Sequence, residues 1–112
     1  MKISTALLVL AAGASMAGTA GAADIVGNPN AAPNKIEMCI GCHGIPEYKG
    51  TFPEVYRVPK IGGQSAKYIE AALQAYKKGD RNHPSMRGIA VSLSDQDIAD
   101  IAAYYSKQTP SK

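Results

Sequence analysis

The chain carries an apolar face at helical spacing between residues 65 and 78. The members of this face recur at positions i, i+3, i+4 and i+7 and are Ile69, Ala72, Leu73 and Tyr76. Ser65 precedes the face and is suited to cap a helix N-terminus, and Gly79 follows it as a stop signal. We therefore predict a helix from Ser65 to about Lys78.

A second apolar face lies near the C-terminus of the chain. Its members are Ile98, Ile101, Ala102 and Tyr105. Ser94 is suited to cap this helix, and Asp97, three positions later, can return the hydrogen bond in a short-armed capping box. These signals predict a helix from Asp95 to about Lys107.

A third helix is predicted from about Ala31 to Cys42, because Ile36 and Ile40 share a helical face with Cys39. The segments 44–64 and 80–93 contain prolines and glycines without helical periodicity, and we predict that both are loops. In the first loop, the candidate side chains for packing against a cofactor are Tyr48, Phe52, Val55, Tyr56, Val58 and Ile61. The pattern predicts an all-α fold with three main helices.

The first 23 residues differ in character from the rest. A basic Lys2 is followed by the apolar run 6–12 and by small residues that end at Ala23. This order is typical of a cleaved secretory signal peptide, and the apolar run is too short to favour a membrane anchor. We predict a signal peptide over residues 1–23, one domain over 24–112, and no membrane span after cleavage.

The candidate chemistry lies in the pentapeptide Cys39-Ile40-Gly41-Cys42-His43. Two thiols three positions apart share one face of a helical turn, so both can form thioethers with the vinyl groups of one porphyrin. The histidine that follows can place its imidazole on the iron. Cys-x-x-Cys-His indicates covalent c-type haem attachment. We predict one haem c bound through Cys39 and Cys42, with His43 on the proximal side.

Three other interpretations of this motif compete with haem attachment. A thioredoxin-like redox pair belongs near a βαβ pattern, and the flanking sequence is not rich in strands. A structural zinc site needs four ligands, which would be Cys39, Cys42, His43 and His83, and a histidine directly after a cysteine is poorly placed for chelation. A local disulfide would leave the adjacent His43 without a role.

Size and charge agree with a haem protein. Cleavage after Ala23 removes 23 of the 112 residues and leaves 89, a length at which a small core often needs a covalent or metal staple. The formal net charge of the whole chain is only +3. Two haem propionates would bring the protein near neutrality, so bulk charge gives no indication of nucleic-acid or membrane binding.

The chain has four methionines, and each is a candidate for the iron ligand on the opposite face of the haem. Met1 and Met16 lie in the predicted signal peptide, and Met38 is too close to Cys39 to cross the porphyrin. Met86 remains by elimination as the sixth iron ligand. His83 is a rival ligand, and Met86 could instead fill a gap in the core.

If protein atoms fill both axial positions, no coordination site is open for a substrate or dioxygen. The remaining acidic residues are scattered and form no acid–base pair or nucleophile constellation. We therefore expect no enzymatic activity. The chemistry left to such a site is outer-sphere electron transfer.

Several further stretches accompany the haem motif in a fixed order. They are Cys-Ile-Gly-Cys-His-Gly at 39–44, Pro-Lys-Ile-Gly-Gly-Gln at 59–64, Tyr-Lys-Lys-Gly-Asp-Arg at 76–81, His-Pro-Ser-Met at 83–86, and the helix at 93–105. With them the chain resembles a class I cytochrome c of the small bacterial c4, c5 and c-553 kind. The resemblance implies a compact fold in which the terminal helices cross beside the haem. It implies His43 and Met86 as axial ligands, and Pro59 as a haem-packing residue whose carbonyl accepts the His43 Nδ1–H.

The function expected from these observations is that of a soluble periplasmic monohaem carrier of single electrons. We expect a monomer whose partners are redox proteins and that does not bind nucleic acid. The donor would be a quinol-oxidising complex or a dehydrogenase, and the acceptor a terminal oxidase or reductase of a respiratory chain. Two alternatives stay open. One is a haem subunit docked permanently on a dehydrogenase, and the other is a ligand-binding or sensor haem with a weak distal ligand.

Overall fold

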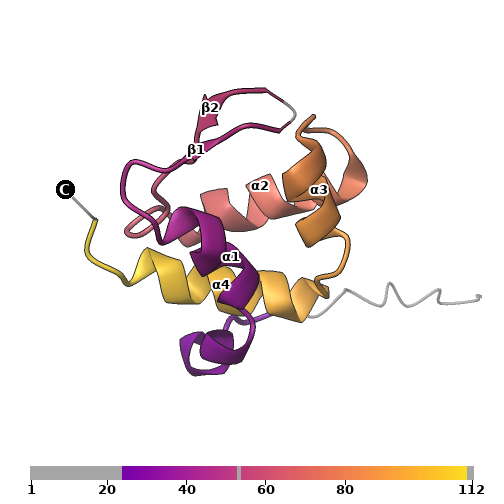
Figure 1. Cartoon of the computed structure of the whole chain (residues 1–112). Coiled ribbons are helices and arrows are strands. Elements are labelled where there is room, and N and C mark those ends of the chain that lie inside the picture. Colours follow the sequence, from indigo (N-terminus) through magenta and orange to yellow (C-terminus); the bar gives the residue numbers. More distant parts are fainter. Residues whose placement is uncertain (1–23, 53, 111–112) are drawn as a thin grey trace, which may run out of the picture.

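The computed structural model describes residues 24–52 and 54–110, so the predicted signal peptide lies outside the described residues. The structure is mainly helical, with one short β-hairpin between α1 and α2 in the chain (Figure 1). In chain order the elements are the 3₁₀ helix η1 (Pro29–Asn34), α1 (Glu37–His43), β1 (Lys49–Gly50), β2 (Tyr56–Arg57), α2 (Ala66–Lys78), α3 (Pro84–Ala90) and α4 (Asp95–Ser106). The predicted helical fold class is confirmed.

Helices α2 and α4 begin and end close to where the sequence predicts. Ser65 Oγ accepts the Tyr68 N–H at 3.5 Å, and Gly79 ends α2 in the left-handed conformation at φ 89°. That φ is open to glycine at little steric cost. Ser94 and Asp97 form the reciprocal capping box of α4. Both predicted N-caps are therefore confirmed.

The core lies between α2 and α4, with η1 packed against α4 and α3 against α2. Its buried members are Ala32, Ile36, Ile69, Leu73, Leu93, Ile98, Ile101, Ala102 and Tyr105. All four predicted face residues of α4 are buried in it, and so are two of the four from α2. Burial of each large aliphatic side chain stabilises the fold by about 1.5–3 kcal/mol.

The predicted helix over residues 31–42 is wrong in its first half, where the structure has η1 and then a break before α1. Pro33 lies inside η1 and lacks an N–H, and its ring disfavours the α conformation at Ala32. The chain instead forms a tighter turn, in which the Lys35 N–H donates to the Ala32 carbonyl at 2.7 Å. Helix α1 begins at Glu37, with Ile36 as its N-cap residue.

The predicted loop over residues 80–93 contains helix α3. His83 is its N-cap, and Pro84 occupies the first turn, where a missing N–H costs nothing. Because Pro84 starts this helix, it does not interrupt one. Met86 therefore lies on a helix, and the expectation of a loop around it is wrong.

The predicted loop over residues 44–64 contains the antiparallel hairpin of β1 and β2, with Lys49 opposite Arg57 and Gly50 opposite Tyr56. Gly50 is buried against the Tyr56 ring, and a Cβ at this position would lie 2.5 Å from that ring. Glu47 and Arg57 form an ion pair beside the hairpin. Two-residue strands are too short to produce a recognisable alternation in the sequence.

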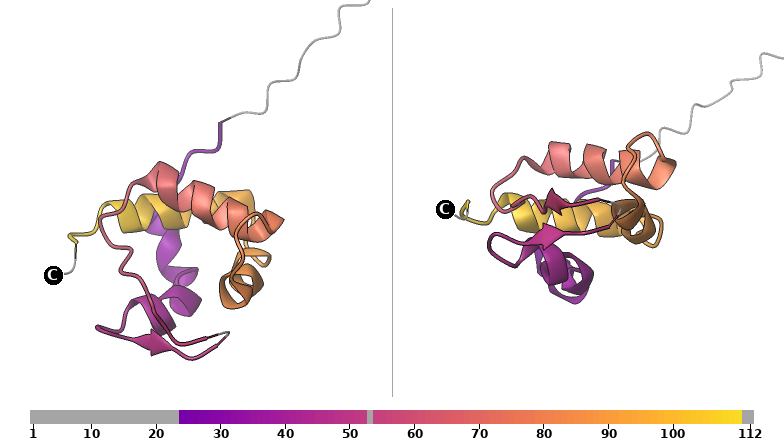
Figure 2. Two further views of the ribbon diagram at one scale, coloured as in Figure 1. Left: turned by 90° about the horizontal axis from the view of Figure 1, so that it is seen from above. Right: turned by 45° about the horizontal axis from the view of Figure 1, so that its top comes forward.

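Helices α1 and α3 extend from the same side of the α2–α4 pair, near its two ends (Figure 2). The hairpin lies on that side as well, with its turn toward α3 (Figures 1 and 2). Elements far apart in the sequence thus surround one region of the molecule. Of the helices described here, none is both long and apolar enough to cross a membrane.

Candidate haem site

Helix α1 presents the two cysteines and the histidine of the attachment motif within its seven residues. Cys39 and Cys42 are free thiols one turn apart, the first partly buried against the core and the second exposed. Burial raises the pKa of the Cys39 thiol. Both sulfurs are therefore available for thioether bonds on one side of α1.

His43 ends α1 and is oriented by the loop that follows the hairpin. Its Nδ1 lies 2.6 Å from the Pro59 carbonyl oxygen. A carbonyl can only accept, so Nδ1 carries the proton and donates, which leaves the Nε2 lone pair for a metal. A hydrogen bond of this kind fixes the tautomer and the ring orientation of a ligating histidine. This contact is the one that the family resemblance implies.

Met86 lies in the first half of α3, partly buried. It packs against the same hydrophobic core cluster as Cys39, although 47 positions separate the two residues. Helices α1 and α3, which carry the predicted ligands, also lie on one side of the α2–α4 pair (Figure 2).

His83, the rival ligand, has other partners in the structure. Its Nδ1 accepts the backbone N–H of Met86 at 3.3 Å and so caps α3. Its ring meets the rings of Tyr56 and Tyr76 edge-on, with centroid separations of 4.7 and 6.4 Å. The capping role was not found from the sequence, because histidine is not among the preferred N-cap residues.

The six loop side chains considered for cofactor packing do not behave alike. Tyr48, Phe52 and Val55 are exposed, whereas Tyr56, Val58 and Ile61 are partly buried. Ile61 packs against the core, and it also borders a cavity of about 270 Å³ beside His43. Of these six side chains, Ile61 is the one that borders both the core and this cavity.

Tyr104 and Tyr105, near the C-terminal end of α4, also line this cavity. Their rings meet edge-on at 5.3 Å. Burial, together with the neighbouring Cys39 and Tyr104, raises the pKa of Tyr105 to about 12. Tyr105 is therefore a neutral phenol at physiological pH and adds no charge beside α1.

The other interpretations of the cysteine motif find little support in this geometry. Among residues 24–52 and 54–110, no three His, Cys, Asp or Glu side chains are grouped so that they could hold a metal ion. The strands described in the structure are the two of the antiparallel hairpin, which is not a βαβ arrangement. The donor set consists of two free thiols, an oriented imidazole and a thioether, and it fits a covalently attached haem.

This combination defines the class: small helical proteins with a Cys-x-x-Cys-His haem attachment. Residues 32–108 match the family model described as cytochrome c. The chain is 46% identical over 85 residues to cytochrome c-554(548) of Halomonas halodenitrificans, covering 73% of this chain and 98% of that relative. The chain therefore belongs to the cytochrome c family, in class I, and carries one covalently bound haem c.

Two further comparisons extend the likeness. The crystal structure of reduced recombinant cytochrome c4 from Pseudomonas stutzeri has a TM-score of 0.54 and 26% identity, covering 75% of this chain and 52% of that one. A thiosulfate dehydrogenase electron acceptor of Thiomonas intermedia is 35% identical over 81 residues, or 72% of this chain and 36% of the relative. The chain thus spans about half or less of these two relatives. Membership of the family makes it a monohaem electron carrier.

Proposed function

We propose that this chain is an exported, periplasmic cytochrome that transfers single electrons between respiratory redox proteins, with His43 and Met86 as its axial iron ligands. The observation that carries the proposal is the packing of Cys39 and Met86 against one core cluster, beside an imidazole oriented by Pro59. The haem, when bound, supplies an iron that alternates between Fe(III) and Fe(II).

The protein's own groups would hold that iron in a six-coordinate state. The Pro59 carbonyl keeps the proton on Nδ1 of His43, so Nε2 faces the metal as a neutral donor. The Met86 thioether favours Fe(II) and so raises the reduction potential. His83 Nδ1 accepts the Met86 N–H, so a neutral His83 carries its proton on Nε2 and has no lone pair left for the iron, which supports methionine as the distal ligand. With both axial positions filled, only an electron enters or leaves.

We propose a quinol-oxidising complex or a dehydrogenase as donor and a terminal oxidase or reductase as acceptor. The relative whose name describes it as a thiosulfate dehydrogenase electron acceptor favours a dehydrogenase among the donors. The same relative favours a second candidate function, a haem subunit permanently docked on such an enzyme. Purification of the exported protein from its host distinguishes the two: a carrier is recovered as a separate monomer, and a subunit is recovered with its enzyme.

The distal assignment is tested by Met86→Ala, with Met38→Ala as the matched control on an exposed methionine next to Cys39. Loss of the Met86 thioether opens the sixth position. The reduced variant should bind carbon monoxide at pH 7, and its potential should fall by on the order of 100 mV, within the roughly 0.8 V that axial ligation spans. Met38→Ala should change neither property. A Met86→Ala protein that excludes carbon monoxide and keeps its potential would remove Met86 from the iron.

A further inference from the structure

The N-terminus of α3 is built around a histidine. His83 has an extended backbone at φ −156° and ψ 102°, and its Nδ1 accepts the N–H of Met86 three residues later. Such an N-cap bond is usually made by serine, threonine, aspartate or asparagine. Here the bond ends on the backbone amide of the proposed distal ligand itself.

The imidazole of His83 is held by two other elements. Tyr56 of β2 meets the ring edge-on at an interplanar angle of 86°, and Tyr76 of α2 does so at 76°. Tyr76 is covered in turn by the Arg81 guanidinium, 4.6 Å from its ring centroid. The His83 ring therefore joins the hairpin, α2 and α3 at one point.

Helix α3 has only seven residues, and so short a helix is not stable by its own hydrogen bonds. Its geometry depends on its caps and its packing. The Met86 N–H is bonded to His83, and the His83 ring in turn contacts Tyr56 and Tyr76.

We propose that His83, in edge-on contact with the rings of Tyr56 and Tyr76, is a positioning residue that holds the Met86 backbone and so keeps the thioether on the iron. The inference rests on the proposed function, because it takes Met86 as the distal ligand. His83 does not itself bind the iron. Its loss leaves Met86 as the ligand at equilibrium and lets the ligand dissociate more readily.

The test is the binding of imidazole to the oxidised holoprotein, since an external ligand enters only when the Met86 thioether leaves. His83→Ala should bind imidazole about five- to tenfold more tightly, the factor that corresponds to a lost N-cap. The charge-transfer band between iron and methionine sulfur should remain in the absence of imidazole. His83→Asn should restore affinity close to that of the natural protein, because the asparagine side-chain oxygen can accept the same N–H.

Ser94→Ala is the matched control, because it removes the N-cap of a helix without a haem ligand. It should lower stability without changing imidazole affinity. Unchanged affinity in His83→Ala, or an equal gain in Ser94→Ala, would overturn the proposal. If His83→Ala fails to fold, Tyr56→Leu is the deciding variant. It should raise the imidazole affinity, because it removes an aromatic contact of His83. An affinity equal to that of the natural protein would overturn the proposal.

The same imidazole assay, applied to Met86→Ala, tests the proposed function separately from the role of His83. If Met86→Ala binds imidazole no more tightly than the natural protein, Met86 is not the distal ligand and the proposed function loses its axial pair. If Met86→Ala binds imidazole tightly while His83→Ala does not differ from the natural protein, the axial pair stands and only the positioning role fails.

Discussion

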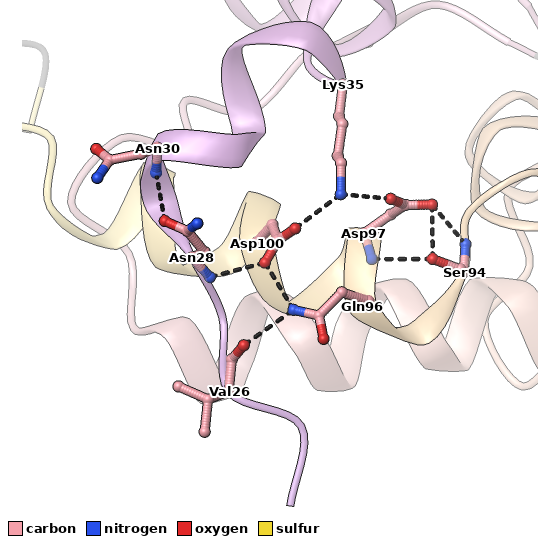
Figure 3. Close-up of polar contacts among 8 residues, drawn as sticks. All are labelled: Val26, Asn28, Asn30, Lys35, Ser94, Gln96, Asp97 and Asp100. Atoms are coloured by element: carbon pink, nitrogen blue, oxygen red, sulfur yellow. Dashed lines mark hydrogen bonds and ion pairs between the residues drawn. The ribbon is translucent and has the colours of Figure 1, made fainter.

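Asp100 offers the most quantitative test of how the fold supports the haem-bearing helix. Among the described residues it is the buried polar or charged side chain, with 2% of its surface exposed. Its carboxylate accepts hydrogen bonds from Asn28 N–H at 2.7 Å, Lys35 Nζ at 2.7 Å and Gln96 Nε2 at 2.8 Å (Figure 3). Lys35 also pairs with Asp97 at 2.7 Å. The network ties the segment that precedes α1 onto α4.

The perturbation is Asp100→Asn, which keeps the shape and removes the charge. The amide oxygen can still accept from Asn28, whereas the Lys35 ammonium keeps only Asp97 as a carboxylate partner. Breaking a buried pair outright costs about 3–5 kcal/mol, and hydrogen bonds to charged groups contribute about 1.5–3 kcal/mol each. We expect Asp100→Asn to lose about 2–3 kcal/mol. For a domain of this size that lowers Tm by roughly 10–20 °C.

The assay is thermal and urea unfolding of the holoprotein at pH 7, followed by circular dichroism. The matched control is Asp80→Asn, which removes the same charge from an exposed position outside the network. The control should stay within about 0.5 kcal/mol of the natural protein. Loss of under 0.5 kcal/mol in Asp100→Asn would refute the reasoning, because the charged contact between Asp100 and Lys35 would then contribute little.

The effect of pH gives an independent check. The Asn28 N–H and then the Lys35 ammonium lower the pKa of Asp100 below its ordinary value. A carboxyl whose pKa is lower in the folded than in the unfolded state contributes stability above the unfolded pKa, near 4, and loses it as the pH falls through the folded pKa. The difference between natural protein and Asp100→Asn should therefore be constant above about pH 5 and shrink below pH 4. An unchanged difference at pH 2 would contradict this account.

Two smaller changes test the ends of the long helices. Gly79→Ala should destabilise the protein by about 1–2 kcal/mol, because Gly79 has φ 89° and an added Cβ would lie 2.4 Å from the Arg87 guanidinium; unfolding in urea measures the loss, and a stability gain would contradict it. Ser94→Ala should cost about 1 kcal/mol through the lost capping box, whereas Ser94→Asp should keep most of the stability; equal losses in both variants would contradict the capping role.

The sequence predicted the two helices whose apolar spacing and end signals agree. In α2 and α4 the serine caps, the buried faces and the glycine after Lys78 all indicate the same boundaries, and the structure has them there. The Cys-x-x-Cys-His motif was equally easy to recognise, because its functional side chains lie within five consecutive residues. Local signals of this kind need no knowledge of distant contacts.

The parts that were missed depend on contacts between distant segments or on proline in an unexpected role. Helix α3 begins at Pro84 with a histidine cap, and that cap is supported by Tyr56 and Tyr76 from other elements. In the sequence Asp100 cannot be distinguished from the other scattered acidic residues. The fold brings Asn28 and Lys35 into hydrogen-bonding distance of its carboxylate. Such pairings across 65–72 positions leave no periodic trace in the sequence.

The central claim is that His43 and Met86 hold the iron of one covalently bound haem. The most direct test is the absorption spectrum of the exported protein, oxidised and then reduced. The account predicts covalent haem together with the weak charge-transfer band between ferric iron and methionine sulfur. Covalent haem without that band would contradict the Met86 assignment and favour a site that is open or has two histidine ligands.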